Sequence, residues 1–141
     1  MLWFNRRTQT EAWEAEIKWP IGDLEAARKI REICNSVMGS AEMVGSRSRA
    51  ETKANKRETE KYKRAAKIAM EIAIKISDDL LRDAAVSQIV VLCVRANDLP
   101  TAAILLRAVQ AVSIREGLLS EYPALRDAAL QAAGGLLSEA D

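Results

Sequence analysis

Histidine is absent from this sequence of 141 residues. Its absence removes the commonest general base, the Ser–His and Cys–His nucleophile pairs, and the HExxH zinc motif. Cys34 and Cys93 are the two cysteines, and without histidine they cannot complete a usual closed zinc site. Phosphate-binding loops of the GxxxxGK(S/T) and GxGxxG types are absent as well. The sequence therefore predicts a protein that is not an enzyme and that holds no metal and no cofactor.

Aromatic residues, glycine and proline are also scarce. Aromatics make up 4% of the chain, which has six glycines and three prolines, whereas 49% of the residues are hydrophobic and alanine, leucine, isoleucine and valine dominate among them. The alternating β-branched and aromatic runs that mark strands are nearly absent. These features predict an all-α fold. The length is that of a single domain, residues 1–141.

Long hydrophobic runs are lacking too. The longest, Ile89–Val94, is far shorter than the roughly 20 residues that span a bilayer. The apolar start of the chain is too short for the hydrophobic region of a secretory signal. We therefore expect a cytoplasmic protein without a membrane contact. Cys34 and Cys93 each lie within an apolar helical pattern, so buried free thiols are expected rather than the alternative, a disulfide of a secreted protein.

Apolar spacing and punctuation residues predict about six helices. Pro20 ends a first helix over 8–18, and Asp23 is a good N-cap for a second over 23–37. Ser77-Asp78-Asp79 ends a long helix over 48–76 and caps the next, over 80–96. Asn97-Asp98 is the turn and cap before a helix over 99–112. A weaker helix or bent continuation follows over 113–119, and a last helix starts at Tyr122-Pro123, with Gly134-Gly135 near its end.

The chain is expected to divide into a hairpin over 1–37, a flexible linker over 38–48 rich in glycine and serine, and a hairpin core over 49–137. The long helix changes character along its length. Its first half, to Arg64, is almost wholly polar, and we expect a basic extension that the core does not need. Its second half, over 65–76, is apolar except for Lys67, Glu71 and Lys75, which predicts a helix surrounded by others.

Short sequences recur along the chain. Leu81-Arg-Asp-Ala-Ala-Val86 returns as Leu125-Arg-Asp-Ala-Ala-Leu130 at an offset of 44 residues, and Gly22-Asp-Leu-Glu-Ala-Ala27 resembles Asn97-Asp-Leu-Pro-Thr-Ala102. Such recurrence is typical of stacked helical hairpins. In these starts and in its small residues at helix crossings the chain resembles TPR-like α-α repeats. HEAT-like stacking and an irregular bundle remain open as alternatives. The resemblance implies a scaffold that binds a peptide or protein on a concave face, without chemistry and without assigning any binding residue.

Neighbouring charged residues could carry chemistry in three places. Asp78-Asp79 could hold magnesium only with further carboxylates, so we interpret the pair as a helix cap. Arg82-Asp83 and Arg126-Asp127 are interpreted as salt bridges of the hairpins and as first-turn charges rather than as catalytic pairs.

The sharpest charge signal is basic. Residues 47–67 contain nine Lys or Arg and three Glu, a net charge of +6, within a chain whose net charge is +1. Three interpretations are open for this segment: a solvated helix, a contact with an acidic protein, or a contact with nucleic-acid phosphate. Tyr62 is its one aromatic residue, too few for a stacking platform. The basic candidates for partner binding are Arg49, Lys53, Lys56, Arg57, Lys61, Lys63 and Arg64.

Aromatic residues gather at the start of the chain, where Trp3, Phe4, Trp13 and Trp19 lie. Trp13 fits a core position. Trp3 and Phe4 either pack on the bundle or anchor a partner or a second copy of the chain, because tryptophan often carries much of the energy of an interface. The sequence as a whole predicts a non-catalytic protein-binding module, such as an adaptor, an inhibitor or an assembly subunit. The alternative is an accessory protein that contacts nucleic acid through residues 47–67.

Overall fold

The computed structural model describes residues 21–46 and 53–140. Their regular structure is helical throughout, which confirms the all-α fold. The six helices of this part of the chain are α2 (Asp23–Ser46), α3 (Lys53–Ala73), α4 (Asp79–Arg95), α5 (Leu99–Leu106), α6 (Val112–Glu121) and α7 (Pro123–Ala140). The helix expected over 8–18 lies outside the described residues. None of the described helices is long and apolar enough to cross a membrane.

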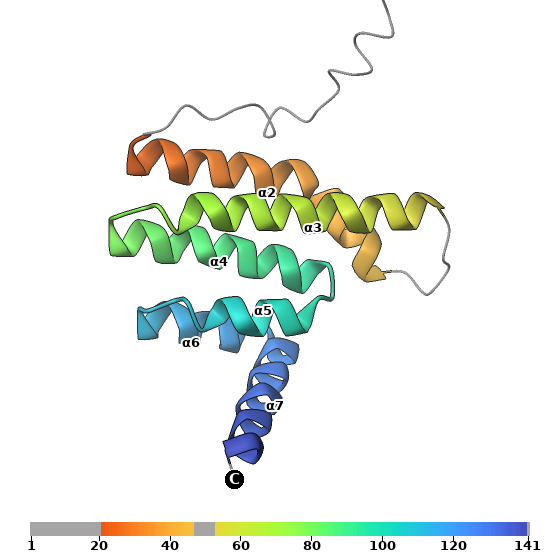
Figure 1. Cartoon of the computed structure of the whole chain (residues 1–141), viewed down its shortest axis with the longest axis vertical. Coiled ribbons are helices and arrows are strands. Elements are labelled where there is room, and N and C mark those ends of the chain that lie inside the picture. Colours follow the sequence, from red (N-terminus) through yellow and green to blue (C-terminus); the bar gives the residue numbers. More distant parts are fainter. Residues whose placement is uncertain (1–20, 47–52, 141) are drawn as a thin grey trace, which may run out of the picture.

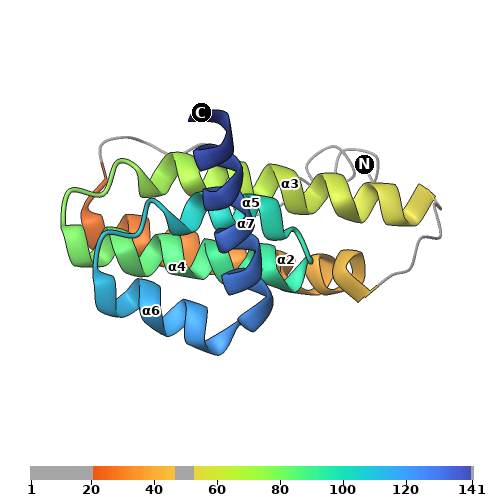
Figure 2. The same cartoon turned by 90° about the horizontal axis from the view of Figure 1, so that it is seen from below.

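Most of the described helices pack against the next helix in the chain, and α2, α4 and α5 also pack against the helix after that. α2 contacts both α3 and α4, α4 contacts α5 and α6, and α5 contacts α7. Figure 1 shows α2 to α5 running roughly side by side, with α7 crossing them steeply at one end of the molecule. The same crossing is visible from below in Figure 2. These contacts support successive helical pairs as the building plan of the protein.

The flexible linker predicted over 38–48 is wrong for its described part. Residues 38–46 form the last turns of α2, in which Ser40 and Ala41 are buried. Within this segment, Gly45 occupies a position where a side chain does not fit. A Cβ atom at this position would lie 2.2 Å from the backbone oxygen of Arg95, at the end of α4. The glycine therefore permits a direct approach of two helix backbones, which sequence alone does not distinguish from flexibility.

Two other boundaries differ from the prediction. α5 ends at Leu106 instead of continuing to residue 112, and its last amides bond three residues back, with Val109 donating to Leu106 at 3.1 Å. Val109 is buried, so the chain turns inward before α6 begins; of the two alternatives for this segment, the structure has a separate helix. α7 continues through Gly134 to Ala140.

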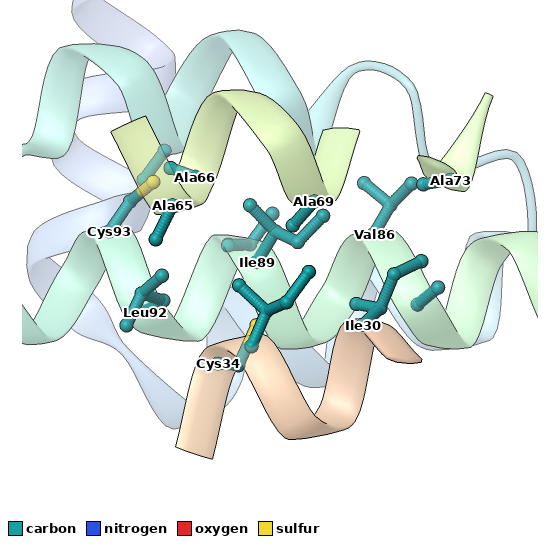
Figure 3. Close-up of a cluster of buried hydrophobic side chains, with 14 of the residues drawn as sticks. Ile30, Cys34, Ala65, Ala66, Ala69, Ala73, Val86, Ile89, Leu92 and Cys93 are labelled. Atoms are coloured by element: carbon teal, nitrogen blue, oxygen red, sulfur yellow. The ribbon is translucent and has the colours of Figure 1, made fainter. Parts of the chain in front are cut away.

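At the centre of the core, aliphatic side chains and cysteines of α2 and α4 face alanines of α3. Ile30 and Cys34 come from α2, and Val86, Ile89, Leu92 and Cys93 come from α4, as Figure 3 shows. α3 contributes alanines at a helical spacing: Ala65, Ala66, Ala69 and Ala73. Large residues facing small ones let neighbouring helices interdigitate closely. Both cysteines are free and buried, which confirms the prediction.

The second half of α3 is less enclosed than its composition predicts. Lys67, Glu71 and Lys75 are exposed, as the polar stripe predicts, but Ile74 is 67% exposed beside them. α3 packs against α2 and α4. Among the described residues, this half of α3 is therefore packed against two helices and leaves Ile74 uncovered.

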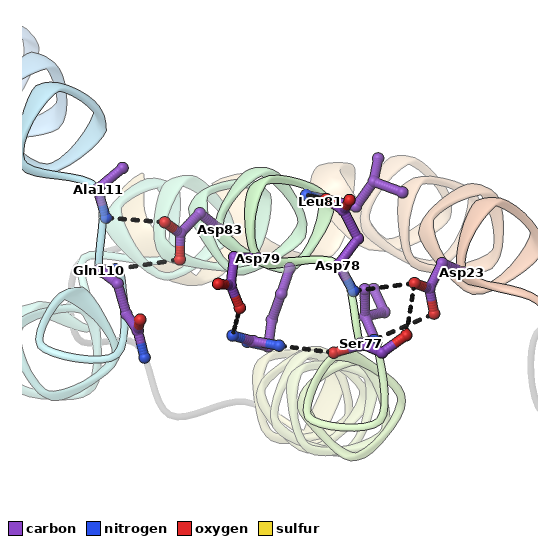
Figure 4. A network of polar contacts seen from close by, with 10 residues as sticks. Asp23, Ser77, Asp78, Asp79, Leu81, Asp83, Gln110 and Ala111 are labelled. Atoms are coloured by element: carbon purple, nitrogen blue, oxygen red, sulfur yellow. Dashed lines mark hydrogen bonds and ion pairs between the residues drawn. The ribbon is translucent and has the colours of Figure 1, made fainter.

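Two aspartates join helices at the corners of the fold (Figure 4). Asp23 does not act as the predicted cap of its own helix. Its carboxylate accepts hydrogen bonds from the backbone N–H of Ser77 at 3.1 Å, from the Ser77 hydroxyl at 2.8 Å and from the backbone N–H of Asp78 at 2.9 Å. Asp83, on α4, accepts from the backbone N–H groups of Gln110 at 3.0 Å and Ala111 at 2.8 Å.

An arginine completes each corner in the same way. Arg82 donates from Nη1 to the carbonyl of Ile76 at 2.7 Å, and Arg115 donates from Nη1 to the carbonyl of Val109 at 2.6 Å. The α3–α4 corner thus returns at the α5–α6 corner 33 residues later, since Ile76 corresponds to Val109 and Arg82 to Arg115. The recurrence found in the sequence has a different offset. It relates α4 to α7, where Asp83 is buried and its counterpart Asp127 is exposed.

Candidate interaction surface

Three of the carboxylates considered for chemistry, Asp78, Asp79 and Asp83, have structural partners. Asp78 caps α4, since its Oδ1 accepts from the backbone N–H of Leu81 at 2.9 Å, as predicted. Asp79 forms an ion pair with Arg82, so the arginine pairs with Asp79 instead of the neighbouring Asp83. In the described residues, no three His, Cys, Asp or Glu side chains come together in a way that could hold a metal ion. Asp78 and Asp79 therefore have structural roles at the start of α4.

The two thiols are poorly suited to nucleophilic chemistry. Burial raises the pKa of Cys34 to about 12 and, with the neighbouring Asp98 acting in the same direction, raises the pKa of Cys93 to about 11. The thiolate is the nucleophilic form, and it is scarce at neutral pH when the pKa is this high. The two cysteines thus serve as small apolar residues between α2, α3 and α4.

The candidate residues for partner binding differ in position and in exposure. Arg49, Trp3 and Phe4 lie outside the described residues, and Lys53 begins the helix. Lys61 is half-buried. The remaining basic candidates on α3 are exposed. Together with the neighbouring Lys67, they form what we call the basic face of α3: Lys56, Arg57, Lys63, Arg64 and Lys67.

Tyr62 shows that this part of α3 is not a dispensable extension. Its side chain is 2% exposed, and its hydroxyl donates a hydrogen bond to Oδ2 of Asp98 at 2.8 Å. Burial above all, with Cys93 and Asp98 nearby, raises the pKa of this tyrosine. Asp98 also caps α5, accepting from the backbone N–H of Thr101 at 3.5 Å, in agreement with the predicted cap. The basic half of α3 is therefore fastened to the turn between α4 and α5.

A signal for the position of Tyr62 was present in the sequence. Tyr62 stands three residues before Ala65 and four before Ala66, so it continues the buried face of α3 by one turn towards its start. A segment rich in lysine and arginine conceals this pattern, because the other residues of the turn are polar. For the described part of the segment, residues 53–64, the expectation that the core does not need it is wrong for this reason.

The described part of the chain has grooves between helices, of which three bear on the candidate surface. One of about 370 Å³ lies between α2 and α4 and includes Arg31, Asn35, Met38 and Gln88. Another, of about 630 Å³, lies between α5 and α7 and is mostly apolar, with Ile104 and the exposed Asp127 in its lining.

The third groove, of about 240 Å³, adjoins the basic face of α3, and we call it the α3–α5 groove. Its lining residues are Tyr62, Lys63, Ala66, Lys67, Met70, Asp98, Thr101 and Leu105. This groove combines exposed lysines, apolar side chains and the Tyr62–Asp98 hydrogen bond. It is the one of the three grooves that includes residues of the basic face. The candidate surface therefore consists of the basic face of α3 and the α3–α5 groove beside it.

Comparison of the chain with protein-family models, with curated proteins and with solved structures found no match. The interpretation of this surface rests on its own residues.

Proposed function

We propose that this protein is a non-catalytic interaction module of the cytoplasm, an adaptor, inhibitor or assembly subunit, which binds an acidic partner protein through the basic face of α3. The observation that carries the proposal is the exposure of five cationic side chains on a helix that is held in place from beneath by Tyr62. A helix with fixed charges can attract and orient an oppositely charged surface.

A non-catalytic role is supported by what the chemically capable side chains do. Asp78, Asp79 and Asp83 bond to helix ends or to arginine, and both thiols have raised pKa values. The sequence contains no histidine to serve as a general base. The exposed cationic side chains of α3 support binding as the function instead.

The second candidate function is contact with nucleic-acid phosphate through the same cationic residues, because the net charge of +6 over residues 47–67 suits a polyanion. Single-stranded nucleic acid is usually held by bases stacked on aromatic side chains. The aromatic residue of this segment, Tyr62, is 2% exposed and so cannot offer its ring to a base. We therefore favour a protein partner.

The test compares two charge-reversal variants in the full chain. The first changes four residues of the basic face to glutamate: Lys56, Arg57, Lys63 and Arg64. The second is a matched control that makes the same change at exposed arginines on other helices or at their ends: Arg28, Arg95, Arg107 and Arg126. Affinity capture from the source cells, followed by mass spectrometry, is expected to lose its acidic partners with the first variant and to keep them with the second.

Nucleic-acid binding is measured on the same proteins by fluorescence anisotropy with labelled duplex DNA and single-stranded RNA at about 150 mM salt, where the screening length is about 8 Å. The proposal predicts little binding to either probe. Tight binding of the wild type that disappears in the first variant alone would favour the nucleic-acid function and overturn the proposal. Capture of the same proteins by wild type and first variant would also overturn it.

A further inference from the structure

The two sides of the α3–α5 groove carry different charges. Lys63 and Lys67 line it from α3 and are exposed, whereas Asp98 and Thr101 line it from the turn before α5 and from the first turn of that helix. The carboxylate of Asp98 is held by the hydroxyl of Tyr62 at 2.8 Å. An anionic ligand is therefore attracted to the lysines on the α3 side and repelled by Asp98 on the α5 side. This difference determines on which side of the groove the anionic groups of a ligand bind.

The groove also contains apolar surface. Ala66 is 9% exposed, and Met70 and Leu105 are half-buried. Its volume of about 240 Å³ lies below the roughly 300–1,000 Å³ of pockets that enclose small molecules. A space of this size suits one or two side chains of a macromolecule. Methionine adapts to differently shaped apolar partners, so Met70 is well suited to such a contact.

The spacing of the lysines indicates the shape of the ligand. Lys63 and Lys67 are four residues apart on α3, which corresponds to about 6 Å along the helix axis. Two carboxylates that are one turn apart on a helix of the ligand have the same spacing. An apolar residue on the same side of the ligand helix then faces the α3–α5 groove.

We propose that the α3–α5 groove binds an acidic amphipathic helix of a partner protein. Two acidic residues one turn apart pair with Lys63 and Lys67, and a large apolar side chain contacts Ala66, Met70 and Leu105. This proposal rests on the proposed function, because it names the kind of protein segment that the basic face receives. A nucleic-acid backbone fits less well, because it has no apolar side chain to cover Met70 and Leu105.

The experiment selects ligands for the folded full-length chain from a phage-displayed library of random peptides about 16 residues long, a length that can form several helical turns. Enriched peptides are synthesised, and their affinities are measured by fluorescence anisotropy. The expected result is a set of peptides with two acidic residues three or four positions apart and a large apolar residue beside them. Their circular dichroism is expected to become helical on binding.

Three variants locate the binding site. Lys63→Glu with Lys67→Glu reverses the α3 side of the groove. Thr101→Glu adds a negative charge on the α5 side without touching either lysine. A glutamate at this third helical position, after the Asp98 cap, is favourable for α5, so the variant is expected to fold. Arg57→Glu with Arg64→Glu makes the same charge change as the first variant at exposed residues of α3 outside the groove lining.

Both groove variants are expected to weaken peptide binding by about tenfold or more, and the control by much less, because close charge pairs contribute more than distant ones. Circular dichroism and thermal unfolding verify that each variant is folded. Acidic peptides that depend on Arg57 and Arg64 but not on the groove would overturn the groove proposal and leave the proposed function standing. Enrichment of no peptide, or of peptides without acidic residues, would also overturn it. Duplex DNA that displaces the selected peptides and binds more tightly than they do would overturn both proposals.

Discussion

The two ends of α2 are both fastened to α4, but by different means. At the start of α2, the carboxylate of Asp23 binds the backbone N–H of Asp78, next to the first residue of α4. At the other end, Gly45 lies against the carbonyl of Arg95, the last residue of α4. The two helices therefore run parallel. The first attachment is polar and exposed, and its bonds require an ionised carboxylate. The second is a backbone approach that requires the absence of a side chain.

This difference shows how one pair of helices can be held both by charge and by shape. Hydrogen bonds to an exposed carboxylate compete with water and depend on pH. A close contact of two backbones does not compete with water and does not depend on pH, but it leaves no space for an additional atom. Four substitutions separate the two effects.

Gly45→Ala tests the attachment by shape. The added Cβ would meet the Arg95 oxygen at 2.2 Å, so the ends of α2 and α4 must move apart. Overpacking of this kind costs about 1–3 kcal/mol of unfolding free energy. Urea denaturation at pH 7 and at pH 5 is expected to give the same loss, because neither backbone group titrates. An unchanged midpoint would mean that this end of α2 does not need the close approach.

Asp83→Asn tests the carboxylate attachment in a buried setting. Asp83 is 2% exposed and accepts from two backbone N–H groups before α6. An asparagine has one acceptor oxygen, and its amide NH2 group would face one of these two N–H donors. We expect a loss of about 1–3 kcal/mol by urea denaturation, since a donor that loses its acceptor retains the cost of its desolvation. The exposed Asp127→Asn serves as the control, with a change within about 0.5 kcal/mol. Equal effects at the two positions would contradict the role of Asp83 at the corner.

Gly39→Ala distinguishes glycine as a packing residue from glycine as a weak helix former. Gly39 lies in the same helix as Gly45, but a Cβ at this position would have no neighbouring atom within 4 Å. Alanine is expected to stabilise the protein by about 0.5–1 kcal/mol, because it lowers the entropy lost on helix formation. Thermal unfolding of the two glycine variants should therefore shift in opposite directions. A shift in the same direction would show that the space at position 39 is not open.

Asp23→Asn tests the polar attachment and its dependence on pH. Hydrogen bonds from the Ser77 backbone, then from its hydroxyl and from Asp78, hold the pKa of Asp23 below its usual value of 3.8. The stability that Asp23 contributes is therefore present above the ordinary pKa and is lost as the pH falls through the lowered one. Thermal unfolding is expected to show the wild type more stable than the variant at pH 6, with the difference declining below about pH 4. A difference that stays constant down to pH 2 would exclude the carboxylate as its source.

Several elements were predictable because their signals are local. Asp78 and Asp98 cap α4 and α5 through bonds to residues three positions later, so neighbouring residues suffice to recognise them. The apolar spacing of α4 likewise predicts buried Ile89 and Leu92. Asp23 has an equally good capping position in the sequence, but its acceptor oxygens are used by residues more than fifty positions away. No local pattern distinguishes these two uses of an aspartate.

The candidate surface likewise has one feature that the sequence predicts and others that depend on tertiary packing. The basic character of residues 47–67 is a property of composition, and the sequence alone predicts it. The exposure of the individual candidates is not predicted in this way: Lys61 is half-buried in the structure, whereas Lys63 and the neighbouring Lys67 are exposed and line a groove. The opposite side of that groove comes from Asp98, Thr101 and Leu105, which follow after the whole of α4. A groove between two helices becomes visible only once their packing is known.

The amino-acid sequence by itself determined the helical fold, the helix caps that act on their own helices, the burial of both cysteines and the concentration of positive charge in one segment. These properties depend on local propensity, periodicity and composition. The tertiary structure alone decided that residues 38–46 continue α2, that Tyr62 supports the basic half of α3, and which lysines border a groove. Each of these depends on a contact between residues distant in the chain: Gly45 with Arg95, and Tyr62 with Asp98. Such contacts follow from the packing of whole helices, which no single segment encodes.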